Sequence, residues 1–435
     1  MKKVLVIAYY FPPHGGGGVI RIHNFVKYLP QFEFLPVILT LKDDYYEKTS
    51  SYPELLREYT EEIKIIRTAS FEPKARGIKD KVYGLKKKNI IDSLVFYLIK
   101  NTIAKLLIPD RSILWAPIAI RTGLKLLKEE KIDIILATSP PFSSNVIAFM
   151  LYKLSGIPYV LDYRDDWVGN NLYSKKNDLF RHNIDKIIER HLIKDAAMVL
   201  ASTEESIELF KEKYPENNPN KFLYIPNGFD PEYFKVTDSV KDNDNKPGEI
   251  NFVYTGSLTI ERTPQFFLLA LREILNASPN LKEIIKITFI GYAHYKHKEY
   301  VKTLGLEKNV KFLQNLSPEK IAEYLREKTD VCLLFQRDSE GGKTAIPGKM
   351  YEYIAAGKPI LCMDDSGATT RFLENIGSGL NTKYDSPKEI GKLVDTLIYN
   401  YKKISKLYTW DDSLKNKYNR KNHTKYLASI LHNIS

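Results

Sequence analysis

Short apolar runs rich in β-branched residues recur along this chain, separated by segments with helical periodicity. Several runs are apolar throughout rather than alternating with polar residues, which is typical of parallel strands covered on both faces. Strands that alternate with helices in this way predict a doubly wound α/β fold. The predicted strands cover residues 3–9, 36–41, 63–68, 133–138, 158–163, 197–202, 250–256, 286–291, 310–313, 331–335 and 358–363.

The strand–helix series runs twice. A chain of 435 residues is too long for one hydrophobic core, so two domains are expected. The charged segment 235–249 contains Asn, Pro and Gly but no periodic apolar residues, as linkers do. We therefore expect an N-terminal Rossmann-like domain over 1–234, the linker over 235–249, a C-terminal Rossmann-like domain over 250–406 and a helical segment over 407–435.

Cysteine use and hydropathy indicate a cytoplasmic protein. Cys332 and Cys362 both lie in predicted buried strands, and two cysteines cannot form a disulfide framework for this length. The first apolar run is short and ends in prolines and glycines, unlike a signal peptide. No apolar segment reaches the roughly 18 residues that a membrane span needs, and no Cys/His spacing predicts a zinc site.

The net charge of +12 favours an anionic partner, such as a nucleotide, a phospholipid surface or a nucleic acid. The basic residues are spread along the chain and no nucleic-acid-binding motif is present, so nucleic acid is the least favoured. The basic, aromatic segment 81–117 has apolar residues at helical spacing. This segment has two possible interpretations. It makes peripheral contact with the inner face of an anionic membrane, or it packs on its own domain.

Four glycines, Gly15 to Gly18, follow the first predicted strand and open a helix. Glycine lets backbone N–H groups approach a phosphate or sugar, and the helix N-terminus adds partial positive charge. The spacing of these glycines differs from that of the dinucleotide-binding fingerprint. The alternative to a binding loop is a flexible turn that contacts no ligand. His14 is a candidate contact for a proton or hydroxyl of the acceptor; the alternative is that it is a solvated histidine in the loop. Arg21 is a second acceptor-side candidate.

The stretch IPGKMYEYIAAGKPIL, residues 346–361, forms a second strand-to-helix junction. Gly348 and Lys349 open a short helix at the end of a predicted strand, which favours anion binding. Glu352 lies one turn later on the face shared with Gly348. Its carboxylate can accept hydrogen bonds from two vicinal ribose hydroxyls while a diphosphate lies on the helix end. The alternative is a surface glutamate favoured by the helix-end charge.

This stretch resembles the donor-nucleotide signature of glycosyltransferase family 4, the retaining, metal-independent enzymes of the GT-B fold. Other segments agree in order and span the whole chain: YFPPHGGGGVIR, IPNGFDPEYF (225–234), VYTGSLTIERTPQFFLLAL (253–271) and YTWDD (408–412). The stretch DYRDDW (162–167) is similar to an element of the branch that builds bacterial surface polysaccharides.

The resemblance implies two domains facing each other across a cleft, a nucleotide-sugar donor, a lipid-linked saccharide acceptor, and no cofactor or metal. We expect one of the carboxylates in the DYRDDW stretch to pair with Arg164. The alternative is a metal site formed by Asp162, Asp165 and Asp166. The implied catalytic residues are Arg164, Asp165, Arg262 and Lys349. The implied nucleotide-sugar-binding residues are Gly15, Gly16, Gly17, Gly18, Gly256, Arg262, Gln314, Leu316, Thr344, Gly348, Lys349 and Glu352, with base recognition around Gln314 to Leu316.

The sequence also departs from the family pattern. Thr344 stands where a second glutamate is common, eight positions before Glu352, and Glu340 lies in another register. Ser257 replaces an arginine, whose charge we expect Arg262 and Lys349 to supply. These departures keep a second hypothesis open, in which the chain is a non-catalytic partner that binds sugar nucleotides within a biosynthetic complex.

Overall fold

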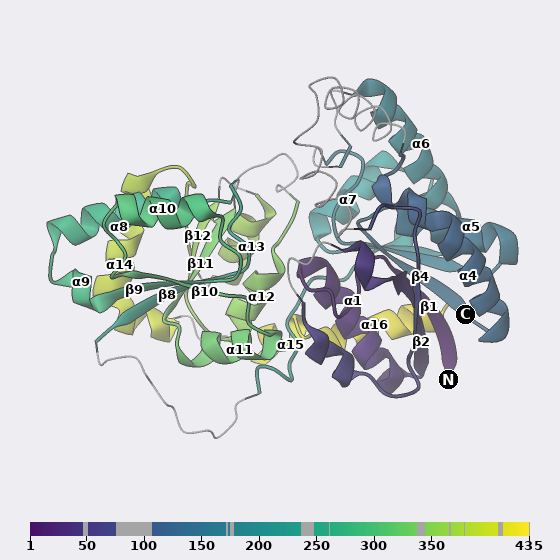
Figure 1. Ribbon diagram of the computed structural model, residues 1–435, viewed down its shortest axis with the longest axis horizontal. Helices are drawn as coiled ribbons and strands as arrows, with labels where there is room; N and C mark the ends of the chain where they lie inside the picture. Colours follow the sequence, from purple (N-terminus) through teal and green to yellow (C-terminus); the bar gives the residue numbers. More distant parts are fainter. Residues whose placement is uncertain are drawn as a thin grey trace, which may run out of the picture. The chain divides into compact units, whose positions relative to one another are not determined.

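The computed structural model describes residues 1–46, 51–74, 107–170, 173–174, 178–235, 248–260, 262–336, 344–364, 367–377, 379–407 and 412–434. They form two compact units, one of residues 1–226 with 423–435 and one of residues 227–422. Each unit is a parallel sheet with helices on both faces (Figure 1). The chain therefore has the two Rossmann-like domains that the sequence predicts.

The sheet of the first unit has seven strands in the order β3-β2-β1-β4-β5-β6-β7. The direction of strand addition reverses between β1 and β4, and ligands of such sheets bind at the carboxyl ends of the strands near this point. The strands are β1 (Lys2–Ala8), β2 (Phe34–Leu41), β3 (Lys64–Thr68), β4 (Ile134–Ser139), β5 (Tyr159–Tyr163), β6 (Met198–Ala201) and β7 (Phe222–Tyr224).

Two apolar clusters hold helices on opposite faces of this sheet. Leu5 and Leu161 pack toward α4 (Ala116–Glu129), α5 (Ser143–Ser155), α6 (Leu179–Asp195) and α7 (Glu204–Lys213). Val4 and Val160 are the neighbours of these residues along the strands, so their side chains point to the opposite face. They pack toward α1 (Gly17–Tyr28) and α16 (Arg420–His432). Short 3₁₀ turns lie at Leu29–Phe32, Asp43–Tyr45, Pro53–Glu58, Arg111–Trp115 and Pro219–Lys221.

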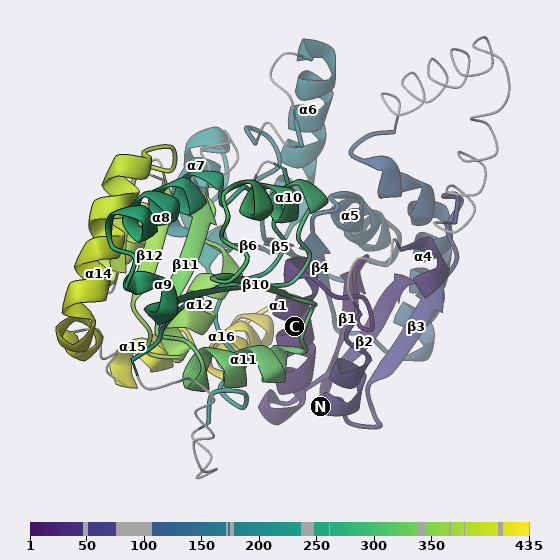
Figure 2. The ribbon, with the colours of Figure 1, turned by 60° about the vertical axis from the view of Figure 1, so that its left-hand side comes forward.

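The second unit repeats the plan with six strands in the order β10-β9-β8-β11-β12-β13, so its reversal lies between β8 and β11. One face carries α8, α10 and α14, and the other carries α11 and α12 (Figure 2) together with α13. The strands are β8 (Ile250–Thr255), β9 (Ile285–Ile290), β10 (Val310–Leu313), β11 (Val331–Gln336), β12 (Ile360–Asp364) and β13 (Gly379–Thr382). The helices are α8 (Gln265–Ala277), α9 (Leu281–Ile284), α10 (Tyr295–Thr303), α11 (Pro318–Glu327), α12 (Gly348–Ala355), α13 (Ala368–Ile376), α14 (Pro387–Leu407) and α15 (Asp412–Lys417).

The eleven predicted strands are all present, but the unit boundaries differ from those expected. Phe229 packs into an apolar cluster of the second unit, so the division falls after Pro226 rather than Phe234. The terminal helix α16 packs Leu427 and Leu431 against the first sheet, because that face needs a second helix beside α1 to cover it. The strands β7 and β13 were not predicted, since FLY and GLNT are too short to give a pattern.

Only the end of the basic segment 81–117 lies within the described residues. There Trp115 is fully buried, and its Nε1 donates a hydrogen bond to Thr68 Oγ1 at 2.7 Å. This end of the segment is therefore core of the first unit, while residues 81–106 lie outside the described part. Among the described helices, none is long and apolar enough to cross a membrane.

Candidate active site

The loops after β8 and β9 meet at the carboxyl edge of the second sheet. The amide of Gly256 donates a hydrogen bond to Ile290 O at 2.7 Å. A Cβ built on Gly291 would lie 2.5 Å from Gly256 O, and both glycines have positive φ values, 110° and 129°. Only glycine permits this close approach in that conformation. The contact places backbone groups directly beside the reversal in strand order.

Lys349, in the first turn of α12, reaches the same place. Its Nζ lies 3.8 Å from the centroid of the Tyr254 ring, a cation–π contact. A Cβ on Gly256 would lie 2.7 Å from the same Nζ. The structure thus brings together Gly256 and Lys349, which the sequence singled out separately. Tyr254 was not predicted, because a tyrosine inside a strand usually indicates only core packing.

Arg262 brings a second positive charge to this group. Burial lowers the pKa of Lys349 well below its usual value, and the charge of Arg262 lowers it further. Burial raises the pKa of Tyr254 to about 12, against the influence of Arg262. Two basic side chains and the N-terminus of α12 therefore converge beside Gly256. Such an arrangement stabilises an anion that is held there.

The position of α12 is fixed by Tyr353. Its hydroxyl accepts a hydrogen bond from Thr255 N at 3.0 Å and donates one to Leu333 O at 3.2 Å. These bonds join the helix to both strands that flank the reversal, β8 and β11. Gly357, with a φ of 69°, ends the helix region as predicted.

Glu352 is half-buried one turn after Gly348. Burial raises the pKa of its carboxyl group, while Arg420 and then Lys349 lower it. Arg420 also donates from Nε to Gly228 O at 2.7 Å. Its influence on Glu352 was missed by sequence reasoning, because nothing in the local pattern links the start of α16 to α12.

The predicted loop for base recognition lies at this edge. Gly291 N donates to Leu313 O at 3.0 Å, and a Cβ on Gly291 would lie 3.3 Å from Asn315 Oδ1. The loop with Gln314 and Leu316 is therefore adjacent to the Gly256 contact. Thr344 is half-buried, shortly before α12, and Ser257 is exposed. Glu340 lies outside the described residues.

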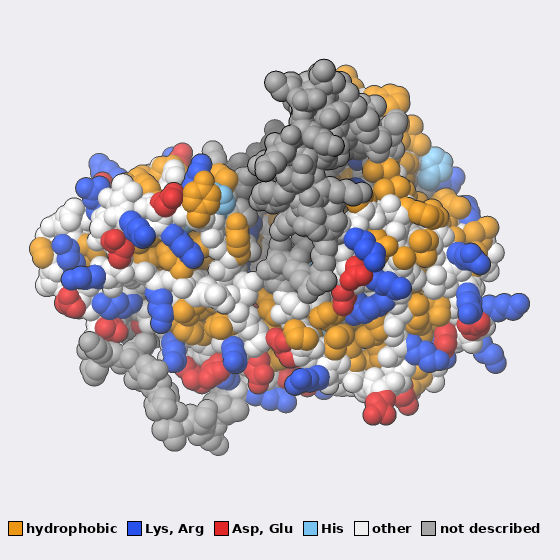
Figure 3. All heavy atoms as spheres, viewed as in Figure 1, with side chains coloured by type: hydrophobic (Ala, Val, Ile, Leu, Met, Phe, Trp, Pro, Cys, Tyr) orange, Lys and Arg blue, Asp and Glu red, His pale blue; other side chains and the backbone are white. Residues whose placement is uncertain are grey.

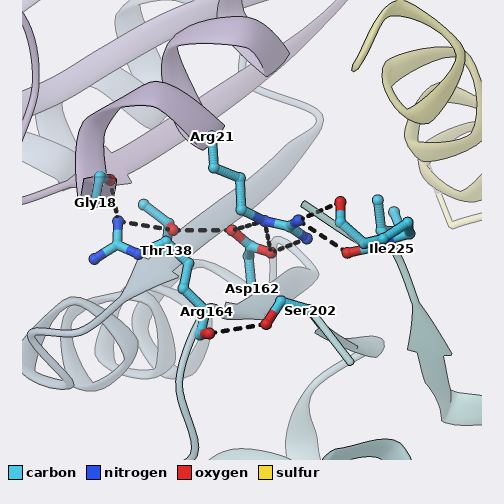
Figure 4. Close-up of polar contacts among 8 residues, drawn as sticks. Gly18, Arg21, Thr138, Asp162, Arg164, Ser202 and Ile225 are labelled. Carbon is cyan, nitrogen blue, oxygen red and sulfur yellow. Dashed lines mark hydrogen bonds and ion pairs between the residues drawn. The ribbon is translucent and has the colours of Figure 1, made fainter. Parts of the chain in front are cut away.

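In the first unit, hydrogen bonds from Arg164 hold the glycine loop, residues Gly15 to Gly18, in place. Gly16 has a φ of 111° and precedes α1, and Gly16 and Gly17 are exposed. The Arg164 guanidinium donates to the carbonyl oxygens of Gly18 and Pro140 (Figure 4 shows the Gly18 bond). Burial lowers the pKa of Arg164. Its side chain joins the loops after β1 and β4, so it positions the glycine loop.

Arg21 is not the acceptor contact that the sequence predicted. It is 1% exposed, and its Nη2 lies 2.8 Å from Asp162 Oδ1. Its Nη1 donates to Ile225 O at 2.8 Å and Pro226 O at 2.9 Å (Figure 4). Thr138 Oγ1 donates to the same carboxylate at 2.9 Å. Arg21 therefore binds α1 to β5 and to the last residues before the second unit.

The other first-unit candidates lie near the same edge. Asp165 is half-buried, accepts a hydrogen bond from Tyr173 OH at 2.9 Å, and has its pKa raised by burial. His14 stacks on Tyr10 with centroids 5.2 Å apart, and burial lowers its pKa. Within the described ranges, no group of three or more His, Cys, Asp and Glu residues could hold a metal ion.

Comparisons with known proteins agree with this architecture. The model described as "Glycosyltransferase Family 4" matches residues 15–233, and that described as "Glycosyl transferases group 1" matches residues 236–409. A search of curated proteins finds no significant match.

Solved structures with the same fold cover the chain from end to end. Sucrose-phosphate synthase from Thermosynechococcus elongatus has a TM-score of 0.70 at 12% identity, covering 100% of this chain and 99% of its own. Anabaena HepE in complex with UDP has 0.65 at 14%, covering 100% of both chains. WaaG, a glycosyltransferase involved in lipopolysaccharide biosynthesis, has 0.63 at 14%, covering 98% and 99%. With the family model matching half of the chain, this protein belongs to glycosyltransferase family 4 and has the GT-B fold.

Proposed function

We propose that this chain transfers a sugar from a nucleotide-sugar to a lipid-linked or polysaccharide acceptor, with retention of configuration and without a metal ion. The observation that carries the proposal is the convergence of Arg262 and Lys349 beside Gly256 and the N-terminus of α12. A leaving nucleoside diphosphate gains negative charge as the glycosidic bond breaks. Basic groups that are fixed in place, and are charged once the diphosphate is bound, stabilise that developing charge without reorganisation, and this lowers the barrier.

Two further observations support the choice of donor. Glu352 lies on α12 one turn after Gly348, and we expect its carboxylate to hold the ribose. In solved structures of the same fold, Anabaena HepE holds UDP and UDP-glucose. UDP is therefore the first nucleotide to test. We expect its base to lie near Gln314, which is exposed.

The proposed setting is the synthesis of a bacterial surface polysaccharide at the inner face of the cytoplasmic membrane. The relative WaaG acts in lipopolysaccharide biosynthesis, and the DYRDDW element points the same way. We also retain the proposed membrane contact for residues 81–106. Lys and Arg side chains are interspersed with Asp and Glu on the face drawn in Figure 3, which gives no support to a nucleic-acid partner.

The test is sugar transfer by the full chain from UDP-, GDP-, dTDP- and CMP-sugars to polyprenyl-linked acceptors, with and without EDTA. Product with unchanged yield in EDTA and retained anomeric configuration supports the proposal. Inversion, or a requirement for metal, contradicts that part of it. Nucleotide-sugar binding without turnover on the native acceptor favours the non-catalytic partner, a hypothesis motivated by Thr344 and Ser257.

Replacing Glu352 with alanine should abolish the stabilisation of the protein by its nucleotide-sugar, because two hydroxyl contacts are lost. The measurement is the shift in melting temperature at a fixed ligand concentration. Glu323→Ala provides a matched control, since this residue lies on α11 in the same unit. A shift as large in the Glu352 variant as in the control would rule out the ribose contact.

A further inference from the structure

The loop that carries Arg262 joins β8 to α8 and spans residues 256–264. Its first half is held by backbone hydrogen bonds to the loop after β9. Leu258 N donates to Tyr292 O at 2.8 Å, and His294 N donates to Leu258 O at 3.0 Å. The side chain of Leu258 is 1% exposed and packs into the core of the second unit. These contacts fix the start of the loop, ahead of the segment that contains the arginine.

The second half of the loop is held by side chains from other parts of the second unit. The hydroxyl group of Tyr384, which follows β13, accepts a hydrogen bond from Thr263 N at 2.9 Å and donates one to Thr263 O at 2.7 Å. One hydroxyl group thus binds both backbone polar groups of a single residue. Tyr384 is 3% exposed, and its ring makes a T-shaped contact with Phe266 at 5.9 Å, centroid to centroid. Packing of the ring therefore fixes the position of the hydroxyl.

His297, on α10, holds the loop at a second point. Its Nε2 lies 2.8 Å from Thr259 O and donates to it, because a carbonyl oxygen can only accept. Burial lowers the pKa of His297, although the hydrogen bond to Thr259 opposes this effect. The neutral ring with its proton on Nε2 is therefore the form that fits this contact.

The two points of contact lie on either side of Arg262. Thr259 Oγ1 accepts a hydrogen bond from Arg262 N at 3.2 Å, so the residue that His297 holds also fixes the backbone of the arginine. Thr263, which Tyr384 holds, is the next residue along the chain. The backbone of the arginine is therefore bracketed by two held residues, while its charge acts within the candidate active site.

We propose that Tyr384 and His297 are positioning residues that hold Arg262 in place for the departing diphosphate. This inference rests on the proposed sugar transfer, in which the arginine stabilises developing negative charge. Preorganised charge is effective because it is already aimed at the position that the new charge will occupy. Both residues act through the loop backbone rather than by touching the diphosphate. Loss of either contact should therefore lower kcat more than donor affinity.

Tyr384→Phe removes both hydrogen bonds and keeps the ring. It should lower kcat by about 10-fold to 10²-fold, the cost of slightly misplacing an active-site group, and should change the donor KM less. Tyr324→Phe is the matched control, because this tyrosine lies in the same unit and its hydroxyl donates to Thr288 Oγ1 in β9 rather than to the loop. The control should leave kcat unchanged. Steady-state kinetics with the nucleotide-sugar that supports transfer measure these effects.

A double-mutant cycle shows whether Tyr384 acts through Arg262. In the Arg262→Ala background, Tyr384→Phe should have no further effect on kcat, because the group that the loop positions is gone. Losses that multiply would mean that the tyrosine acts independently of the arginine, which overturns the inference. His297→Gln keeps a side-chain N–H donor and should retain more of the wild-type kcat than His297→Ala. Equal losses in these two variants would remove His297 from the proposal.

Hydrogen exchange of the full chain without ligand, followed by mass spectrometry, tests the hold on the loop separately from activity. Tyr384→Phe should speed exchange by at least about fivefold in a peptide spanning residues 258–266, because local opening becomes easier. Tyr324→Phe should leave that peptide unchanged, and melting temperatures check the folding of both variants. Unchanged exchange in Tyr384→Phe would overturn the inference. If no nucleotide-sugar binds or reacts, the proposed function fails together with the catalytic part of the inference, while exchange still decides whether the tyrosine holds the loop.

Discussion

Replacing Lys349 with alanine should lower kcat by about 10²–10³-fold, the usual cost of removing one fixed group that stabilises developing negative charge. Lys349 Nζ is held over the Tyr254 ring and against Gly256, so it is positioned before the substrate arrives. Donor affinity should fall less than kcat, because the leaving diphosphate carries more charge in the transition state than in the ground state. Steady-state kinetics with the identified nucleotide-sugar measure both effects.

Two controls make this prediction specific. Lys320→Ala removes an exposed lysine from α11 of the same unit and should leave kcat unchanged. Arginine at position 349 should not restore full activity, because its planar group cannot occupy the space of the compact ammonium between Tyr254 and Gly256. Wild-type kcat in Lys349→Ala would mean that Arg262 and the helix N-terminus suffice.

The lowered pKa of Lys349 adds a pH dependence to donor binding. A bound diphosphate favours the charged lysine and raises the pKa again, so binding takes up protons. Affinity should therefore weaken as the pH rises from the pKa of the free protein toward that of the complex. Calorimetry in two buffers of different ionisation enthalpy measures the uptake, which Lys349→Ala should reduce.

Replacing Arg21 with alanine should destabilise the first unit by about 3–5 kcal/mol, because it leaves the carboxylate of Asp162 buried without its countercharge. Asp162 is 0% exposed, and only the Thr138 hydroxyl would remain of the contacts shown in Figure 4. The carbonyl oxygens of Ile225 and Pro226 would lose their donor as well. Chemical denaturation followed by a first-unit probe, such as Trp115 fluorescence, measures the loss.

A double variant distinguishes an unpaired charge from lost packing. Arg21→Met with Asp162→Leu removes both charges and should be less destabilising than Arg21→Ala alone. Arg57→Ala, at an exposed position of the same unit, should change stability by no more than about 0.5 kcal/mol. Equal losses in the single and double variants would show that burial of the charge is not the cause.

Much of the fold follows from local pattern. Apolar runs such as KVLVIAY and VCLLF become the central strands, because a strand buried on both faces needs continuous apolar sequence. The helix α12 and its end at Gly357 were likewise predicted from local signals. The packing of α16 on the first sheet was not, since amphipathic periodicity shows that a helix has a buried face but not which sheet receives it.

The residues of the candidate site also fall into those that the sequence predicts and those that it does not. Gly256, Arg262 and Lys349 were predicted and are brought together, because each follows a strand whose carboxyl end lies at one edge. Arg21 was placed wrongly, since a sequence does not reveal that an arginine near a glycine loop turns inward to a buried aspartate. Tyr254 and Arg420 act through contacts between distant segments, for which one sequence carries no signal.

The central claim is that the second unit binds a nucleotide-sugar, and a thermal-shift titration tests it most directly. The full chain is titrated with UDP-, GDP-, dTDP- and CMP-sugars. One of them, at 100 times its dissociation constant, should stabilise the protein by about 2.7 kcal/mol, and the shift should vanish in Glu352→Ala. No shift with any of these ligands at millimolar concentration would contradict the account.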